Sequence, residues 1–424
     1  MQQHFRYLGR YQTHAAGSKS GTARRGVLSA WAAGCLMVSG LCTALVINHL
    51  WLSGISADTL RCTEAAALAA GQTLLCDEML RKHQNQFETD GRLERARETA
   101  LMISECYARQ APIPRLKNEG ITFSFPQISD VPCTGKETTC IVVPKQVSVQ
   151  IGTDSPAENL KLFFSGLTRS SAAVRIGSLV HIEHHPTGFH PGNDVPVPML
   201  PFAVPDDHGA CSGPTWSRMI EQDHGGDCWS WNSETQTVEQ GPDGLPELTL
   251  SVTAEQAESR LGQLQLLNFT GNTTAGEHTV SWIQQGLTSE NLHSLGLNQI
   301  EFPQAFPVAS ISPQYISSVA DALGTAVGKP SVVCLIDMPS DDQSQQQDSA
   351  DDSSMSADPK SELQPGSTNL IRPVAARIMR VRMTESLSFL VTLQPCVLCT
   401  STAVMNEARP DADNRYVYNV RLLH

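Results

Sequence analysis

Residues 26–57 read GVLSAWAAGCLMVSGLCTALVINHLWLSGISA, a stretch without Asp, Glu, Lys or Arg. A helix of about 20 such residues is long enough to cross a lipid bilayer. Trp31 and Trp51 lie near the two ends of the stretch, where aromatic side chains gather at membrane surfaces. We therefore predict a transmembrane helix over residues 26–56.

Different charges flank this stretch. Residues 1–25 contain no acidic side chain and five basic ones, Arg6, Arg10, Lys19, Arg24 and Arg25. The chain of 424 residues has 30 basic and 43 acidic side chains, a net charge of −13, so the rest of the chain has 25 against 43, or −18. Basic residues beside a membrane helix stay in the cytoplasm. We predict a cytoplasmic tail over residues 1–25 and place residues 58–424 outside.

Two other interpretations are less favoured. A cleaved signal peptide could end in the small residues SGISA at 53–57, but the apolar run before them exceeds the usual length of ~7–15 residues. Nucleic-acid binding requires clustered Lys and Arg, which a body with a net charge of −18 does not favour. Aromatic residues make up 6% of the chain, too few for a base-stacking platform.

A helical stalk is predicted over residues 57–111. The run EAAALAA at 64–70 forms helix readily, so we expect the first helix to continue through residues 57–88. A break at Asp90-Gly91 precedes a second helix with an apolar stripe of Leu93, Ala96, Ala100, Ile103 and Tyr107. The small-residue faces at 65–70 and at Ala96 and Ala100 are either docking surfaces for partner helices or packed on the protein's own domain.

Residues 112–424 change to β character and are predicted to form a β-rich exterior domain. One helix is expected at 313–327, with Ser312 as its N-cap and Gly328 at its end. Residues 339–368, PSDDQSQQQDSADDSSMSADPKSELQPGST, are too polar to offset their ordering entropy, so we predict a disordered loop. Strands are expected at 141–143, 147–151, 174–182, 248–252, 331–336, 374–383, 387–394 and 416–422.

The predicted fold class is therefore α+β. It consists of an N-terminal transmembrane helix, an Ala-rich helical stalk and a β-rich exterior domain with a few short helices. These segments account for the whole chain after the basic tail.

Several short motifs around the membrane segment occur in the order of a known family. Arg24-Arg25-Gly26 precede the apolar stretch, and residues 60–72, LRCTEAAALAAGQ, follow it. This segment resembles the N-terminus of TadG-like Flp pilus-assembly proteins, which have a basic pair and a Gly, one membrane helix, a D-x-G-x-x-Y turn and an N-A-A-D-A-A-A-L-A-G helix. Asn48 and Trp51 replace the usual Asp and Tyr, and Cys62-Thr63-Glu64 replace the usual A-A-D.

Three later segments extend the resemblance over most of the chain. Residues 94–108, ERARETALMISECYA, are similar to the family's second Ala-rich helix. Residues 163–204 and 225–248 resemble the long forms of planctomycetes and related bacteria, with a Gly-Phe-x-Pro and a D-x-W-x-W … G-x-D-G-I-P-E pattern. The resemblance implies a non-enzymatic, single-pass protein of the bacterial inner (cytoplasmic) membrane that helps to assemble or anchor a Flp-type pilus or a related secretion apparatus. Its implied partners are other pilus-assembly or secretion membrane proteins and the bilayer.

Two features of related proteins do not match this chain. Many TadG-like proteins carry a von Willebrand-type Asp-x-Ser-x-Ser metal site, whereas this chain has Asp337-Met338-Pro339-Ser340. Related pseudopilins are cleaved after a Gly that is followed five residues later by Glu, whereas the fifth residue after Gly26 is Trp31. We therefore expect neither that metal site nor prepilin-type processing.

The densest polar cluster is HIEHH at 181–185. On a strand, alternate side chains share a face, so His181, Glu183 and His185 would lie together. His181 and His185 could then offer two imidazoles to one zinc ion. The alternative is a solvated strand face without metal, because two imidazoles alone lack a third fixed ligand.

A second metal candidate combines His208 and Cys211 with His224 and Cys228, at spacings that can close a tetrahedral zinc site. A Cys211–Cys228 disulfide is favoured over zinc because this segment is predicted outside the cytoplasm. Unpaired residues are the third alternative.

The chain contains 12 cysteines. Cys35 and Cys42 lie in the membrane segment, and the other ten could form up to five bridges whose pairing the sequence does not fix. Cys133 and Cys140 bracket a Gly-containing turn and are the best local pair. Cys396 and Cys399 follow Pro395 at a strand end instead of opening a helix, which argues against a redox motif.

Motifs of nucleophilic catalysis and phosphate binding, such as Gly-x-Ser-x-Gly, His-Glu-x-x-His and the phosphate loop, do not occur in the sequence. We therefore predict no catalytic residues, no cofactor and no small-molecule substrate. The alternative function is a membrane-anchored zinc-binding module or zinc-dependent enzyme that uses the His181 and His208 regions.

Overall fold

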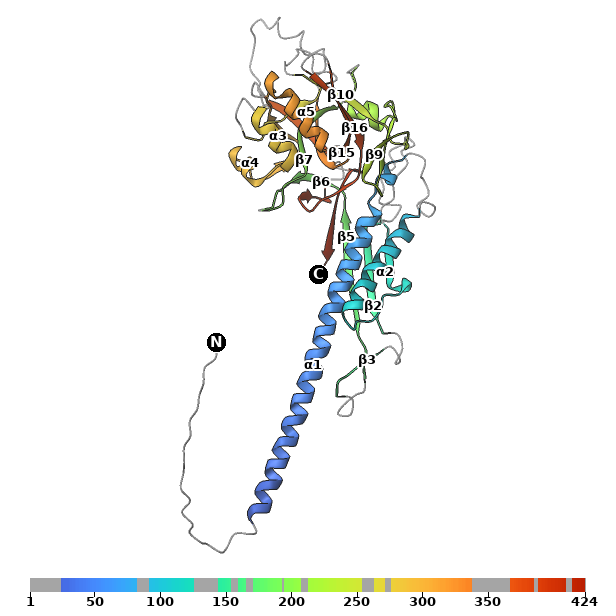
Figure 1. Ribbon diagram of the computed structural model, residues 1–424, viewed down its shortest axis with the longest axis vertical. Helices are drawn as coiled ribbons and strands as arrows, with labels where there is room; N and C mark the ends of the chain where they lie inside the picture. The colour runs from blue at the N-terminus through green and yellow to red at the C-terminus, as the bar shows by residue number, and fades with distance from the viewer. Residues whose placement is uncertain are drawn as a thin grey trace, which may run out of the picture. The chain divides into compact units, whose positions relative to one another are not determined.

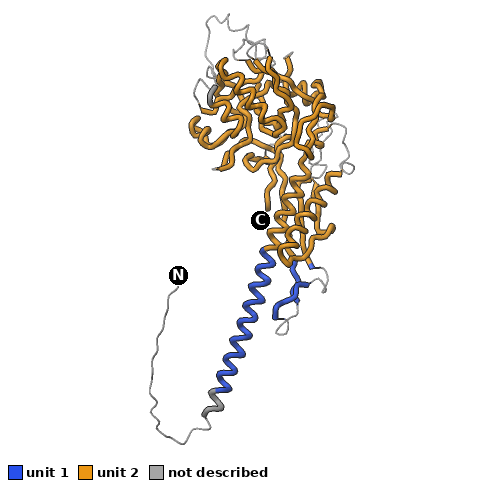
Figure 2. Tube along the Cα trace, in the orientation of Figure 1, with its two compact units in different colours: residues 1–57, 153–174 blue, residues 58–152, 175–424 orange. Residues whose placement is uncertain are grey.

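A computed structural model describes residues 24–81, 91–125, 144–153, 159–164, 171–192, 194–206, 213–253, 263–270, 276–337, 367–384, 388–408 and 414–423. Its fold is α+β, a long apolar helix at the N-terminus followed by a β-rich region with several short helices (Figure 1). The chain divides into two compact units (Figure 2). The first comprises residues 1–57 and 153–174, and the second comprises residues 58–152 and 175–424.

The first unit contains the N-terminal part of helix α1 (Arg24–Leu74) together with strands β3 (Leu160–Lys161) and β4 (Ser171–Ala172). Among the described residues, α1 is the one helix long and apolar enough to cross a membrane, as predicted. Its polar Thr43 hydroxyl donates to the Ser39 carbonyl (2.9 Å), so it is satisfied within the helix. Its exposed apolar side chains include Trp31, Leu36, Met37, Val38, Leu41, Leu45, Val46 and Ile47.

The first helix ends earlier than predicted. We expected it to run to residue 88, but α1 ends at Leu74 and a 3-10 helix, η1 (Asp77–Leu80), follows. The reason is tertiary. The Asp77 carboxylate accepts the Val397 backbone N–H (2.7 Å) and a guanidinium N–H of Arg377 (2.8 Å), contacts that draw the chain out of the helix. Residues 82–88 lie outside the described residues.

In the second unit, the stalk packs on a five-stranded sheet with the order β1-β2-β5-β19-β17. The strands are β1 (Ile121–Ser124), β2 (Gln146–Gly152), β5 (Arg175–Glu183), β19 (Val417–Leu423) and β17 (Leu398–Cys399). A Cβ at Gly71 would lie 3.1 Å from Val420 and 3.4 Å from Val180, so the helix approaches β19 and β5 closely there. The Thr63 and Ser178 hydroxyls are hydrogen-bonded (2.7 Å).

The second stalk helix is α2 (Arg92–Gln110), close to the predicted bounds. The small-residue faces of the stalk are fully buried within the chain, at Ala66, Ala67, Ala70, Ala96 and Ala100. Of the two alternatives, packing on the protein's own second unit is therefore the one that these alanines adopt. Alanines let helix and sheet approach closely, which explains their use here.

A second sheet of seven strands forms the rest of the core, with the order β10-β16-β15-β14-β7-β11 and with β13 paired to β15. Its strands β7 (Met199–Asp206) and β14 (Pro330–Asp337) run parallel, and helices α3 (Gly276–Gln285) and α5 (Ile316–Thr325) contact this sheet (Figure 1). The other strands are β10 (Leu248–Thr253), β11 (Gln265–Leu266), β13 (Gln304–Pro307), β15 (Ser367–Met383) and β16 (Ser388–Pro395).

Short elements complete the second unit. One three-stranded sheet has the order β12-β6-β18, and a hairpin joins β8 to β9. Two short helices, α4 (Ser289–Ser294) and η5 (Pro313–Tyr315), and a π-helical turn (Ser217–Glu221) lie between strands. The strands are β12 (Ile300–Glu301), β6 (Pro186–Phe189), β18 (Ala403–Met405), β8 (Trp229–Asn232) and β9 (Thr237–Gln240).

The predicted strands and the helix at 313–327 agree with these elements, with three differences. The strand expected at 141–143 lies outside the described residues. The helix is split into η5 and α5, and Gly328, with φ of +82° and Trp231 against it, follows their end. Of the predicted loop 339–368, residues 339–366 lie outside the described residues, whereas Ser367 and Thr368 belong to β15 because they pair with β13.

Candidate functional site

His181 and Glu183 lie at the end of β5, in the middle of the five-stranded sheet. Their neighbours Val180 and Ile182 are buried, and Val180 lies on the face that contacts α1 near Gly71. Because side chains alternate along a strand, His181 and Glu183 share the opposite face, as predicted. Both side chains are nevertheless buried, and His181 is only 7% exposed.

Glu407 completes a cluster with these two residues. It lies in the connection between β18 and β19, and one ligand atom from each of His181, Glu183 and Glu407 lies within 4.8 Å of the others. The His181 Nε2 atom is 2.5 Å from Glu407 Oε1. This combination of one imidazole and two carboxylates is a ligand set that zinc accepts.

Two exposed cations balance the carboxylates. Lys145 Nζ lies 3.6 Å from Glu407 Oε2, and an Arg421 nitrogen lies 3.0 Å from Glu183 Oε1. The Asn419 amide donates to Glu183 Oε2 (3.3 Å). The hydrogen bond to His181, supported by the charge of Lys145, lowers the pKa of Glu407 and keeps it ionised.

His185 does not join this cluster. Strand β5 ends at Glu183 and β6 begins at Pro186, so the alternation that would place His185 beside His181 stops between them. The His185 ring instead lies against that of His184, with centroids 4.1 Å apart. Within the described residues, the buried Nδ1 atoms of both His181 and His185 have no hydrogen-bond partner.

Two of the four residues of the second predicted zinc site belong to the described residues. His224 and Cys228 are exposed, after the π-helical turn and just before β8. His208 and Cys211 lie outside the described residues. Both the zinc site and the Cys211–Cys228 disulfide therefore stay predictions, as does the Cys133–Cys140 pair, which also lies outside these residues.

The described cysteines form no disulfide with one another, and several of them are buried: Cys62, Cys334 and Cys396 are in the core, and Cys399 is half-buried. Burial raises the pKa of Cys334 to about 12 and also raises the pKa of Cys396 and Cys399. Thiols with raised pKa values are poor nucleophiles, so these residues act as small apolar side chains.

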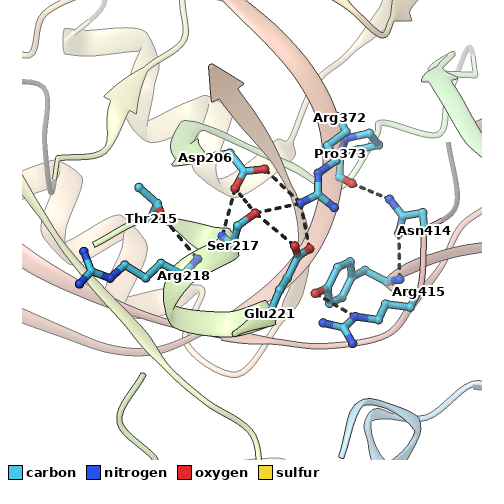
Figure 3. Close-up of polar contacts among 10 residues, drawn as sticks. Asp206, Thr215, Ser217, Arg218, Glu221, Arg372, Pro373, Asn414 and Arg415 are labelled. Atoms are coloured by element: carbon cyan, nitrogen blue, oxygen red, sulfur yellow. Dashed lines mark hydrogen bonds and ion pairs between the residues drawn. The ribbon is translucent and has the colours of Figure 1, made fainter. Parts of the chain in front are cut away.

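A second polar cluster, which the sequence did not indicate, surrounds Arg372 (Figure 3). One guanidinium nitrogen lies 3.0 Å from Asp206 Oδ2 and 2.8 Å from Glu221 Oε1. The Ser217 Oγ lies 2.5 Å from Asp206 Oδ1 and 3.1 Å from Glu221 Oε2. Burial acts to lower the pKa of Arg372, but the two carboxylates favour its charged form more strongly. The pKa of Arg372 is therefore raised.

This cluster joins three elements of the second unit. Asp206 ends β7, Ser217 and Glu221 lie in the π-helical turn, and Arg372 comes from β15. Asp206 is fully buried, and its Oδ1 also accepts the Ser217 N–H (3.0 Å). The Ser217 hydroxyl lies between two carboxylates that both pair with Arg372, so we assign the cluster a structural role.

Sequence reasoning found His181 and Glu183 but missed Glu407 and Arg372. Glu407 is separated from His181 by 226 positions, and Arg372 is separated from Asp206 by 166. Neither residue belongs to a local motif, so only the pairing of strands brings it to its cluster.

Comparison of the chain with protein-family models, with curated proteins and with solved structures finds no match.

Proposed function

We propose that this protein is a non-enzymatic, single-pass membrane component that helps to assemble or anchor a Flp-type pilus or a related secretion apparatus. The observation that carries the proposal is α1. This single helix combines an exposed apolar stretch, which suits a bilayer, with an Ala-rich stretch that packs on the sheet of the second unit. The same order of basic pair, membrane helix and Ala-rich helix is the feature that resembles TadG-like proteins.

The proposed location is the bacterial inner membrane, with residues 1–25 in the cytoplasm and residues 58–424 in the periplasm. The five basic residues before the span, followed by a body with a net charge of −18, support this orientation. Fusion of a reporter enzyme that is active only in the periplasm to residue 424 tests it. We expect activity, and an inactive fusion beside a fluorescent cytoplasmic reporter at the same position would reverse the orientation.

Mild cross-linking in native cells tests the proposed role. We expect the tagged full-length protein to be recovered with membrane components of a pilus or secretion apparatus. A tagged variant with Leu36→Arg and Leu41→Arg, which should not integrate, is the matched control for adventitious partners. Recovery of the same proteins by both forms, or of no such component by the intact protein, would contradict the proposal.

The cluster of His181, Glu183 and Glu407 supports a second candidate function, zinc binding. The imidazole and one carboxylate are already buried and fixed by β5, which reduces the ordering cost of binding. Binding would require Lys145 and Arg421 to release the two carboxylates. The Lys145–Glu407 pair is solvent-exposed, and such pairs contribute only about 0–1 kcal/mol. The chemistry would be ligation by three side chains with an open fourth position.

We expect the purified full-length protein, loaded with zinc and passed over a desalting column, to retain one zinc ion per chain at this site. His181→Ala combined with Glu407→Gln should reduce the retained zinc to background, because two of the three ligands are lost. His293→Ala is the matched control, since His293 is exposed on α4 and belongs to neither predicted zinc set. Equal zinc contents in the double variant and the parent would exclude the site.

A further inference from the structure

The first unit contains a contact between α1 and the segment that carries β3. Asn48 is only 5% exposed, although most of its neighbours along the helix are exposed. Its side-chain oxygen accepts the Phe164 N–H (3.2 Å), and its amide donates to the Phe164 carbonyl (3.4 Å). This two-point hydrogen bond satisfies a polar side chain that would otherwise be costly at the end of an apolar span.

Aromatic side chains lie beside this contact. The ring of Phe163 packs edge-on against that of Trp51, with centroids 4.7 Å apart. Phe163 is nevertheless 63% exposed, and Phe164 is 41% exposed. The contact therefore presents an apolar surface, which we call the aromatic edge and define as Trp51, Phe163 and Phe164.

The position of the aromatic edge along α1 matches the thickness of a bilayer. Arg25 is the last cation before the span, and Asn48 lies 23 residues further along the same helix. At 1.5 Å per residue this is about 34 Å, slightly more than the ~30 Å hydrocarbon core of a bilayer. If Arg25 lies at one membrane surface, Asn48 and Trp51 lie at the other.

We propose that Phe163 and Phe164 insert into the boundary between headgroups and acyl chains on the side of the membrane that faces residues 58–424. The segment around β3 is then a second membrane contact besides the span. Aromatic and apolar side chains at such a boundary bury roughly 5–10 Å into it. The exposed Lys161, next to this pair, suits anionic headgroups. The inference rests on the proposed membrane insertion of α1.

The test is photolabelling by lipids. The full-length protein is reconstituted into vesicles of phosphatidylcholine and phosphatidylglycerol that contain a lipid with a photoactivatable diazirine near the glycerol end of its acyl chain. Trypsin cuts after Lys161 and Arg169, so the peptide 162–169, LFFSGLTR, reports the aromatic pair. The peptide 26–61 reports the span in the same digest.

We expect lipid adducts on both peptides. Adducts on the span peptide alone would overturn the inference and leave the proposed anchor intact, and would point to a protein partner for the aromatic edge. Absence of adducts from both peptides would overturn the anchor as well. The unmodified protein decides these outcomes, so no substitution that impairs folding can obscure them.

Substitutions then test whether labelling of the peptide 162–169 depends on the contact between Asn48 and Phe164. Asn48→Ala removes the hydrogen bonds that hold Phe164, and we expect labelling of the peptide 162–169 to fall while labelling of the span peptide stays unchanged. Met383→Ser is the matched control, because Met383 is an exposed apolar residue of the second unit. Equal loss of labelling in both variants would show that the contact does not position the aromatic pair.

Discussion

Replacing Leu36 and Leu41 with arginine is expected to remove the protein from the membrane fraction. Both leucines are exposed on α1, at 74% and 42%, and lie well inside the apolar stretch. Each arginine near the centre of a membrane helix costs about 2.5–3.5 kcal/mol, and each leucine that it replaces contributed about 0.3–0.6 kcal/mol. The double variant therefore loses about 6–8 kcal/mol of insertion free energy.

Extraction of the membranes with alkaline carbonate measures this effect, because it releases proteins that are not integrated. We expect the parent protein in the pellet and the double variant in the supernatant or degraded. Met102→Arg is the control, since Met102 is an exposed apolar residue of α2 outside the span. If the double variant stayed in the pellet as fully as the control, α1 would not be the anchor.

Arg372→Met is expected to destabilise the second unit by about 3–5 kcal/mol, the usual cost of leaving a buried charge without its partner. The substitution leaves Asp206, which is fully buried, and the nearby Glu221 without their shared cation. Three elements lose their common contact, because the two carboxylates belong to β7 and to the π-helical turn.

Chemical denaturation of the detergent-solubilised protein, followed by tryptophan fluorescence, measures the loss. Trp216 reports the region directly, since it is fully buried one residue before the π-helical turn. Its ring packs edge-on against that of Tyr416, with centroids 5.6 Å apart. Asp206→Asn combined with Arg372→Met should recover part of the stability because it removes the stranded charge. A single Arg372→Met variant with an unchanged denaturation midpoint would contradict the assigned role.

Local pattern was sufficient for much of the fold. The absence of charge over residues 26–57 marked the apolar helix, and alternation marked strands such as β2 and β5. Pattern failed where tertiary contacts override local preference. Helix α1 stops at Leu74 because Asp77 bonds to Arg377 and Val397, groups that lie 300 or more positions away.

The candidate metal cluster likewise contains residues that local pattern predicted and one that only the tertiary structure supplies. His181 and Glu183 were predictable because they are two residues apart on one strand, and the period of a strand is local. His185 was misplaced because the sequence did not show that β5 ends at Glu183. Glu407 arrives through the return of β19 alongside β5, a pairing that depends on the whole sheet.

The sequence by itself determined the apolar span, its flanking charges and the helical or extended character of most segments. These properties follow from hydropathy and from side-chain period, which act over a few residues. The tertiary structure alone decided that the alanine faces of the stalk are internal, that Arg372 neutralises Asp206 and that Phe163 and Phe164 lie beside Trp51. Each of these contacts joins residues more than 100 positions apart or depends on what covers a helix face, and local pattern carries no information about such partners.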